Sequence, residues 1–367
     1  MTTIQPPVSL ARPRQITLPQ CTHQPRAYTG PSKDQVHTLR ETYLSPALFH
    51  LYDQPLMLVE GHMQYVWDET GKRYLDSYAG IVAISAGHCH PKITAKTQAQ
   101  LSALTHTSIL YYHPTAAIYA QKLAEHFPKN SNLSQTYFTN SGSEANEVAF
   151  LAAREFTGNH EIISLRNGYH GGTTAAMAAT GTGVWKYKSN LATGHKFATP
   201  GYCYRCPFGL TYPSCDVRCA RDTEDLIRFE TSGQIAAFIA DPIQGIGGVI
   251  APPKEYFQIQ YDIVRTHGGI CIADEVQTGF GRTGEHFWGF QNWGVTPDIV
   301  TMAKGIGNGC PLAAVVTTHK IAQSLMGKIH FNTFGGNPVV SAAGTAVLEV
   351  IEKEKLQENA LKIGNHI

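Results

Sequence analysis

From Gln135 onward, short apolar runs rich in β-branched residues alternate with segments of helical periodicity. The runs that predict strands are 135–139, 161–165, 235–241, 269–274, 299–303 and 312–317, and the segments that predict helices include 144–156, 255–266 and 320–326. Strands that alternate with helices form a mainly parallel sheet with helices on both faces. The sequence therefore predicts an α/β fold that binds its ligand at the carboxyl ends of the strands.

The remaining segments differ in pattern from this large domain. Residues 58–75 predict short strands around a turn at 68–71, which suggests a smaller α+β domain, and residues 337–362 have long helical periodicity. Residues 1–33 contain no Asp or Glu and several prolines, which is typical of a flexible arm. We expect an arm at 1–33, part of a small domain at 34–85, a large domain at 86–336, and at 337–367 a helix connecting to a C-terminal domain missing from this chain.

The charge balance bears on partners and location. The formal net charge is +1, so no global field favours nucleic acid or an anionic membrane, and a small molecule is the expected ligand. No apolar run approaches the roughly 20 residues needed to cross a bilayer, and no segment near Met1 resembles a signal-peptide core. We expect a cytoplasmic protein. A mitochondrial location is the alternative because the arm is basic, although its prolines would interrupt a targeting helix.

The first chemical motif is Ser141-Gly142-Ser143, between a predicted strand and a predicted helix. Free amides and the helix dipole at such a junction bind phosphate, and a glycine lets the backbone approach closely. Alternatively, the serines only cap the helix, with Ser143 and Asn146 satisfying local amides.

The second motif, Ile272-Ala-Asp274-Glu-Val276-Gln277, ends a β-rich run. A carboxylate buried there needs a cationic partner, and a protonated pyridine nitrogen would be one. Asp274 is the candidate for this role. A turn-capping acid or a magnesium ligand is the alternative.

The third motif places Lys304 at the end of a β-rich run, before Gly305, Gly307 and Gly309. A desolvated lysine forms Schiff bases with carbonyl groups and acts as a base. A solvated loop lysine or a phosphate ligand would look the same in isolation, so the prediction depends on the order of the three motifs.

Together these motifs resemble the class III, fold-type I aminotransferases, from about Leu44 to about Glu352. The matching stretches are Gly87-His-Cys-His-Pro91, Ser141-Gly-Ser-Glu-Ala-Asn146, Tyr169-His170-Gly171, Asp241-Pro-Ile-Gln-Gly245, Asp274-Glu-Val-Gln277-Thr-Gly-Phe-Gly-Arg-Thr-Gly284, Lys304 and Thr333-Phe-Gly-Gly-Asn-Pro338. The resemblance implies pyridoxal 5'-phosphate as cofactor and a fold-type I large domain. It also implies a homodimer with shared active sites.

The resemblance further implies a role for each matching residue. Lys304 would form the Schiff base and Asp274 would pair with the pyridine nitrogen. The cofactor contacts that it implies are Ser141, Gly142 and Ser143 at the phosphate, Tyr169 and His170 beside the ring, Val276 on its other face, Gln277 near the phenolic oxygen, and Thr333 reaching the phosphate of the neighbouring subunit.

Two positions depart from the family pattern. Relatives acting on N-acetylornithine or 4-aminobutyrate tend to have an arginine where this chain has Gly172, and Asp241 stands where a glutamate is usual. The remaining pattern is most similar to the alanine–glyoxylate aminotransferase 2 branch. We therefore expect transamination between an amino acid and a 2-oxo acid, with alanine and glyoxylate as the candidate pair. The alternatives are a 4-aminobutyrate- or ornithine-type aminotransferase, another reaction of the same cofactor, or a catalytically silent paralogue.

One motif stands apart from this function. Cys203, Cys206, Cys215 and Cys219 form a cluster whose first pair has the spacing of zinc ligands. Because transamination in this family needs no metal, we expect reduced thiols in a loop and no bound metal ion.

Overall fold

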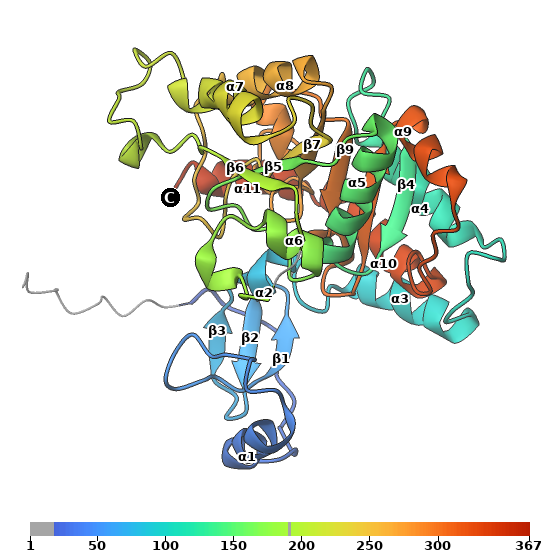
Figure 1. The fold of residues 1–367 in the computed structure, drawn as a ribbon. Coiled ribbons are helices and arrows are strands. Elements are labelled where there is room, and N and C mark those ends of the chain that lie inside the picture. The colour runs from blue at the N-terminus through green and yellow to red at the C-terminus, as the bar shows by residue number, and fades with distance from the viewer. Residues whose placement is uncertain (1–17, 190–191) are drawn as a thin grey trace, which may run out of the picture. The chain divides into compact units, whose positions relative to one another are not determined.

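The computed structural model describes residues 18–189 and 192–367, and it divides the chain into two compact units, Met1–Ser77 and Tyr78–Ile367 (Figure 1). Residues 1–17, half of the predicted arm, lie outside the described residues. None of the described helices is long and apolar enough to span a lipid bilayer.

The first unit contains a short antiparallel sheet and one helix. The sheet has the order β1 (Leu58–His62), β2 (Tyr65–Asp68), β3 (Arg73–Leu75), and the helix is α1 (Lys33–Tyr43). The predicted turn forms because the Asp68 carboxylate accepts hydrogen bonds from the Thr70 and Lys72 amides at 2.9 and 3.0 Å. The arm differs from the prediction after residue 17, because His23 contacts the Glu60 carboxylate at 2.6 Å and stacks on His62.

The second unit is built on a seven-stranded sheet with the order β4-β10-β9-β8-β7-β5-β6. β10 runs antiparallel to both of its neighbours, and the pairs from β9 through β6 are parallel. This confirms the predicted α/β fold with a mainly parallel sheet. The strands are β4 (Gln135–Thr139), β5 (Ile162–Leu165), β6 (His195–Ala198), β7 (Ala237–Ala240), β8 (Ile270–Asp274), β9 (Ile299–Met302) and β10 (Ala313–Thr317).

Helices cover both faces of this sheet because the strands bury side chains on both sides. In β7, Ala237 and Ile239 pack with α5, whereas Phe238 and Ala240 pack in the core that includes α8 and α10. The helices of this unit are α2 (Ala79–Val82), α3 (Pro91–Ala103), α4 (Pro114–Glu125), α5 (Gly142–Thr157), α6 (Thr174–Ala179), α7 (Arg218–Glu230), α8 (Tyr256–Thr266), α9 (His319–Ser324), α10 (Pro338–Lys353) and α11 (Leu356–Gly364).

The long helix predicted at 337–362 is interrupted. α10 ends at Lys353, Lys355 takes a left-handed conformation with φ 53°, and α11 starts at Leu356. α10 is buried along most of its length between α3, α4 and the sheet, so this segment is part of the core of the second unit.

Candidate active site

A cavity of about 180 Å³ opens in the second unit where several strands end. Its lining comes from the segments that follow β4, β5, β7, β8 and β9, as expected for a mainly parallel sheet. The lining residues are Gly142, Ser143, Asn146, Tyr169, His170, Gly171, Asp241, Asp274, Val276, Gln277, Ala303 and Lys304.

The start of α5 forms one wall of the cavity. Ser141 is the N-cap and its hydroxyl accepts the Glu144 amide at 3.2 Å, while the Ser143 hydroxyl accepts the Gly172 amide at 3.0 Å. A Cβ atom at Gly142 would lie 3.1 Å from Val276, so a larger residue would crowd the cavity. The first amides of a helix have no partner inside it, which leaves this end suited to an anion.

Asp274 lies at the bottom of the cavity and is 1% exposed. Its Oδ2 atom accepts hydrogen bonds from Asn146 Nδ2 at 2.9 Å and contacts His170 Nδ1 at 2.8 Å. Its Oδ1 atom accepts only the Val276 amide, at 3.2 Å, among the contacts of the described residues. This oxygen therefore has capacity for one more donor.

Lys304 follows β9 and lines the same cavity, and its backbone has a left-handed conformation with φ 52°. Burial lowers the pKa of its amine, and the charges of Asp274 and Asp241 oppose that effect. A lowered pKa increases the fraction of neutral amine, which is the nucleophilic form.

The aromatic and apolar side chains define the shape of the cavity. Burial raises the pKa of the Tyr169 phenol, and its ring packs edge-on against Trp185 with centroids 5.2 Å apart. Val276 lies next to the start of α5 and Gln277 lines the cavity beside it. A slot with an aromatic ring and an aliphatic side chain in its walls suits a flat ligand.

Not every predicted contact lies in this cavity. Ser141 caps the helix outside the lining, and Thr333 is exposed in the loop before α10. Conversely, Asn146 bonds to Asp274 and to the His170 carbonyl rather than to local amides. Its position one helical turn after Gly142 is the signal that could have placed it in the site.

The comparisons with known proteins agree with this geometry. The sequence model of the aminotransferase class-III family matches residues 50–367. The mitochondrial alanine–glyoxylate aminotransferase 2 homolog 2 of Arabidopsis thaliana is 48% identical over 96% of this chain and 72% of its own length. Human mitochondrial alanine–glyoxylate aminotransferase 2 is 44% identical over 95% and 71%.

Solved structures give the same result. A thermostable (S)-enantioselective omega-transaminase from Thermomicrobium roseum superposes with a TM-score of 0.84 at 36% identity, over 90% of this chain and 77% of its own. A PLP-bound amine transaminase from an uncultivated Pseudomonas species gives 0.82 at 33%, over 88% and 77%. The fold is thus that of the pyridoxal-phosphate-dependent transaminases.

This chain belongs to the class III aminotransferases. It is an enzyme of PLP-dependent transamination, as its sequence predicted.

The residues present fit this cofactor. Its phosphate needs donors, its ring nitrogen needs an anionic acceptor and its aldehyde needs an amine. The helix start at Gly142, the available oxygen of the buried Asp274 and the amine of Lys304 offer these three groups around one cavity. In addition, the buried Asn146 Oδ1 has no hydrogen-bond partner among the described residues.

Proposed function

We propose that Lys304 attaches the cofactor as a Schiff base, that Asp274 pairs with its ring nitrogen, and that Gly142 and Ser143 hold its phosphate. The observation that carries this proposal is the joint placement of a buried carboxylate and a lysine of lowered pKa in one cavity at the strand ends. Tyr169, His170, Val276 and Gln277 complete the contacts around the ring, and Thr333 is assigned to the phosphate of a neighbouring subunit.

When bound, the cofactor withdraws electrons from the carbon that carries the substrate amino group. Lys304 would take the proton from that carbon onto its Nζ atom and would give it back to the bound cofactor. The negative charge of Asp274 would favour the protonated form of the ring nitrogen, and Asn146 donates to this carboxylate and holds it in place. Tyr169 and Val276 would line the slot that holds the ring.

We propose alanine as amino donor and glyoxylate as acceptor. This assignment rests on the similarity to relatives named alanine–glyoxylate aminotransferase 2 in a plant and in human, and on the absence of an arginine at Gly172. The test is a donor and acceptor screen with the purified enzyme. Conversion of the bound cofactor to its amine form by alanine alone supports transamination, and preferential turnover of ornithine or 4-aminobutyrate would overturn the substrate assignment.

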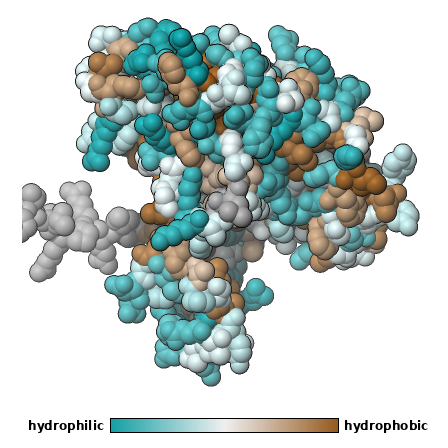
Figure 2. All heavy atoms as spheres, viewed as in Figure 1, coloured by the Kyte–Doolittle hydropathy of each residue, from teal (hydrophilic) through white to brown (hydrophobic). Residues whose placement is uncertain are grey.

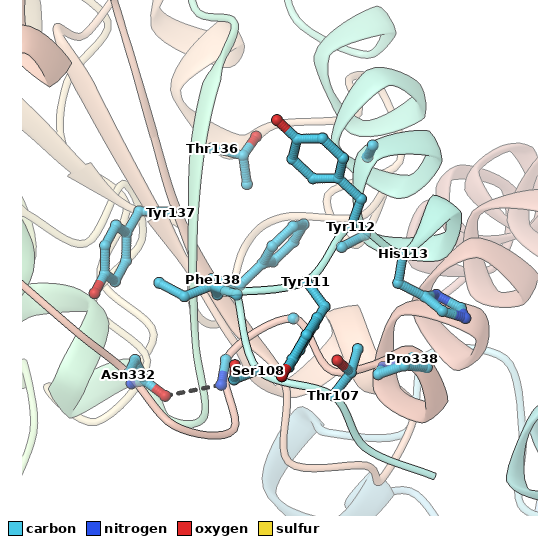
Figure 3. A pocket seen from close by; sticks show the side chains of 15 residues that line it. Thr107, Ser108, Tyr111, Tyr112, His113, Thr136, Tyr137, Phe138, Asn332 and Pro338 are labelled. Carbon is cyan, nitrogen blue, oxygen red and sulfur yellow. Dashed lines mark hydrogen bonds between the residues drawn. The ribbon is translucent and has the colours of Figure 1, made fainter. Parts of the chain in front are cut away.

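We propose a homodimer formed through an apolar surface beside β4. A cavity of about 320 Å³ lies there, lined by the loop 107–113, by β4 and by the start of α10 (Figure 3). Figure 3 shows Tyr111, Phe138 and Pro338 around it. Leu110 and Tyr111 are 79% and 72% exposed, and Figure 2 shows hydrophobic atoms over this part of the unit. We propose a second copy as the occupant because Thr333, which is assigned to the phosphate of a neighbouring subunit, directly follows the lining residue Asn332.

The dimer proposal is tested by placing a negative charge on the proposed interface. Tyr111→Asp should shift the enzyme toward monomer in sedimentation experiments, because a buried unpaired carboxylate is costly in an interface. Tyr204→Asp is the matched control, since Tyr204 is an exposed tyrosine outside this surface. An unchanged dimer in the Tyr111 variant, or a monomeric parent, would refute the assignment of this surface.

The names of the plant and human relatives place them in the mitochondrion, whereas the sequence predicted a cytoplasmic protein. These names support the mitochondrial alternative. Detection of the protein in separated cell fractions decides between the two locations.

A further inference from the structure

Two buried carboxylates lie close together at the carboxyl ends of two inner strands of the seven-stranded sheet, and only one of them has a proposed role. Asp274 ends β8, and Asp241 follows the neighbouring strand β7. The two strands are parallel and their register pairs Ala240 with Ala273. Asp241 and Asp274, the next residues along each strand, therefore lie opposite each other. Asp241 is 7% exposed and accepts the Tyr169 amide at 3.3 Å.

His170 lies close to both carboxylates. Its Nδ1 atom is 2.8 Å from Asp274 Oδ2, and one ligand atom from each of His170, Asp241 and Asp274 lies within 4.8 Å of the others. A Cβ atom at Gly168 would lie 3.2 Å from His170 Nε2 and 3.6 Å from Asp241 Oδ2, so both atoms border one small space. The buried Nε2 atom has no hydrogen-bond partner among the described residues.

The backbone holds this histidine firmly. The His170 amide donates to Thr180 Oγ1 at 3.1 Å, and its carbonyl accepts from Asn146 Nδ2 at 2.7 Å. The ring is 2% exposed, so water has little access to satisfy Nε2. Asp241 makes no hydrogen bond to this nitrogen, but its buried carboxylate acts on the His170 ring through its charge.

We propose that Asp241 is a positioning residue that acts through His170 on Asp274. Asp241 stabilises the doubly protonated ring of His170, which then donates from Nδ1 to Asp274 and fixes the orientation and charge of that carboxylate. This inference rests on the proposed role of Asp274 toward the cofactor nitrogen.

The charges around the group are consistent with this arrangement. Burial lowers the pKa of His170, but the charges of Asp241 and Asp274 outweigh burial and raise it overall. Burial raises the pKa of Asp241, and the positive charges of His170 and Lys304 oppose this rise. The other charged groups that act on these residues are Glu275 beside Asp274, Arg282 beside Lys304 and His195 beside His170.

The first test is made on the parent enzyme as purified, and the variant His170→Asn serves only to assign the signals. Nitrogen NMR reports how many ring nitrogens of His170 carry a proton. We expect the His170 ring to keep its second proton to a higher pH than an ordinary histidine does. A ring that loses this proton at or below the pH of an ordinary histidine would overturn the inference, whatever the cofactor does.

The second test removes the charge of Asp241. In Asp241→Asn, His170 should lose its second proton at neutral pH, and kcat should fall about tenfold to a hundredfold with little change in KM, the range for a lost charge-assisted hydrogen bond. Asp241→Glu should restore the protonated ring. The matched control is Glu275→Gln, because Glu275 is a buried carboxylate after the neighbouring strand β8 that accepts hydrogen bonds from Thr278, Gly289 and Phe290.

These outcomes separate the two proposals. Absence of a borohydride-reducible cofactor in the parent enzyme refutes the proposed function, and the NMR result on His170 still decides the role of Asp241. If the parent binds cofactor normally, but Asp241→Asn matches it in His170 protonation and in the pH titration of the cofactor absorbance, Asp241 has no positioning role.

Discussion

Asp274→Asn is the substitution that tests the site most directly, because it removes one charge and almost no volume. The structure gives two separate consequences. The carboxylate holds Asn146, His170 and the Val276 amide through its two oxygens, and an amide can replace only one of those oxygens. One donor is left without an acceptor, which costs about 1–3 kcal/mol of folding free energy.

The effect on the reaction is larger. Two unit charges about 4 Å apart attract by about 4 kcal/mol at an effective dielectric constant of roughly 20. If this attraction between Asp274 and the ring nitrogen is lost, turnover falls about a thousandfold, since about 1.4 kcal/mol corresponds to a factor of ten. The attachment at Lys304 does not use the carboxylate, so the cofactor should still be trapped by borohydride.

The assay is a comparison of kcat, borohydride trapping and thermal unfolding for the parent and Asp274→Asn. Glu275→Gln serves as control because Glu275 is as buried as Asp274 but lies outside the cavity lining. We expect the control to lose stability without the thousandfold loss of kcat. Near-normal turnover of Asp274→Asn, or equal losses of kcat in both variants, would refute the role assigned to this carboxylate.

Three further predictions concern other residues. Lys304→Ala should abolish the borohydride-reducible attachment, and mass spectrometry that finds the adduct at another lysine would contradict the assignment. Elemental analysis should find no stoichiometric zinc in the loop from Cys203 to Cys219, and about one zinc per chain, lost in Cys203→Ser, would reverse this expectation. The pKa of Asp68 is lowered from 3.8 to about 2, because hydrogen bonds from Thr70 and others outweigh burial. Asp68→Asn should therefore lower the melting temperature above pH 3.8, and its difference from the parent should vanish as the pH falls through about 2; a difference independent of pH would refute that role.

Much of the second unit could be predicted because strongly apolar runs identify buried strands. The six predicted strands correspond to β4, β5, β7, β8, β9 and β10. β6 was not predicted, since its sequence His195-Lys-Phe-Ala contains two polar residues among four. α7 (Arg218–Glu230) was also not predicted, because charged residues dominate it and only one narrow side is buried.

Some residues of the candidate site could also be predicted from the sequence, and some of their contacts could not. Gly142, Asp274 and Lys304 were predicted because each follows a recognisable strand, and the structure brings all three to one cavity. The spacing of Asn146 from Gly142 could place it on the site's side of the helix, but its two partners could not be predicted, since Asp274 and His170 belong to segments near other strands of the sheet. The closeness of Asp241 and Asp274 depends on β7 and β8 being neighbours, and the order of strands in a sheet is not written in local periodicity.

The position of β10 has a consequence for synthesis of the chain on the ribosome. In the described sheet, β4 pairs only with β10. Among the strands of this sheet, β10 is the last in the sequence. The strand that leads into the start of α5 thus has no sheet partner until residues 140–317 have been translated. During that time its edge is open to pairing with other chains, which is a known route to aggregation. Folding on the ribosome should therefore depend on a chaperone until Thr317 has left the exit tunnel. Refolding of the finished chain should require slow dilution.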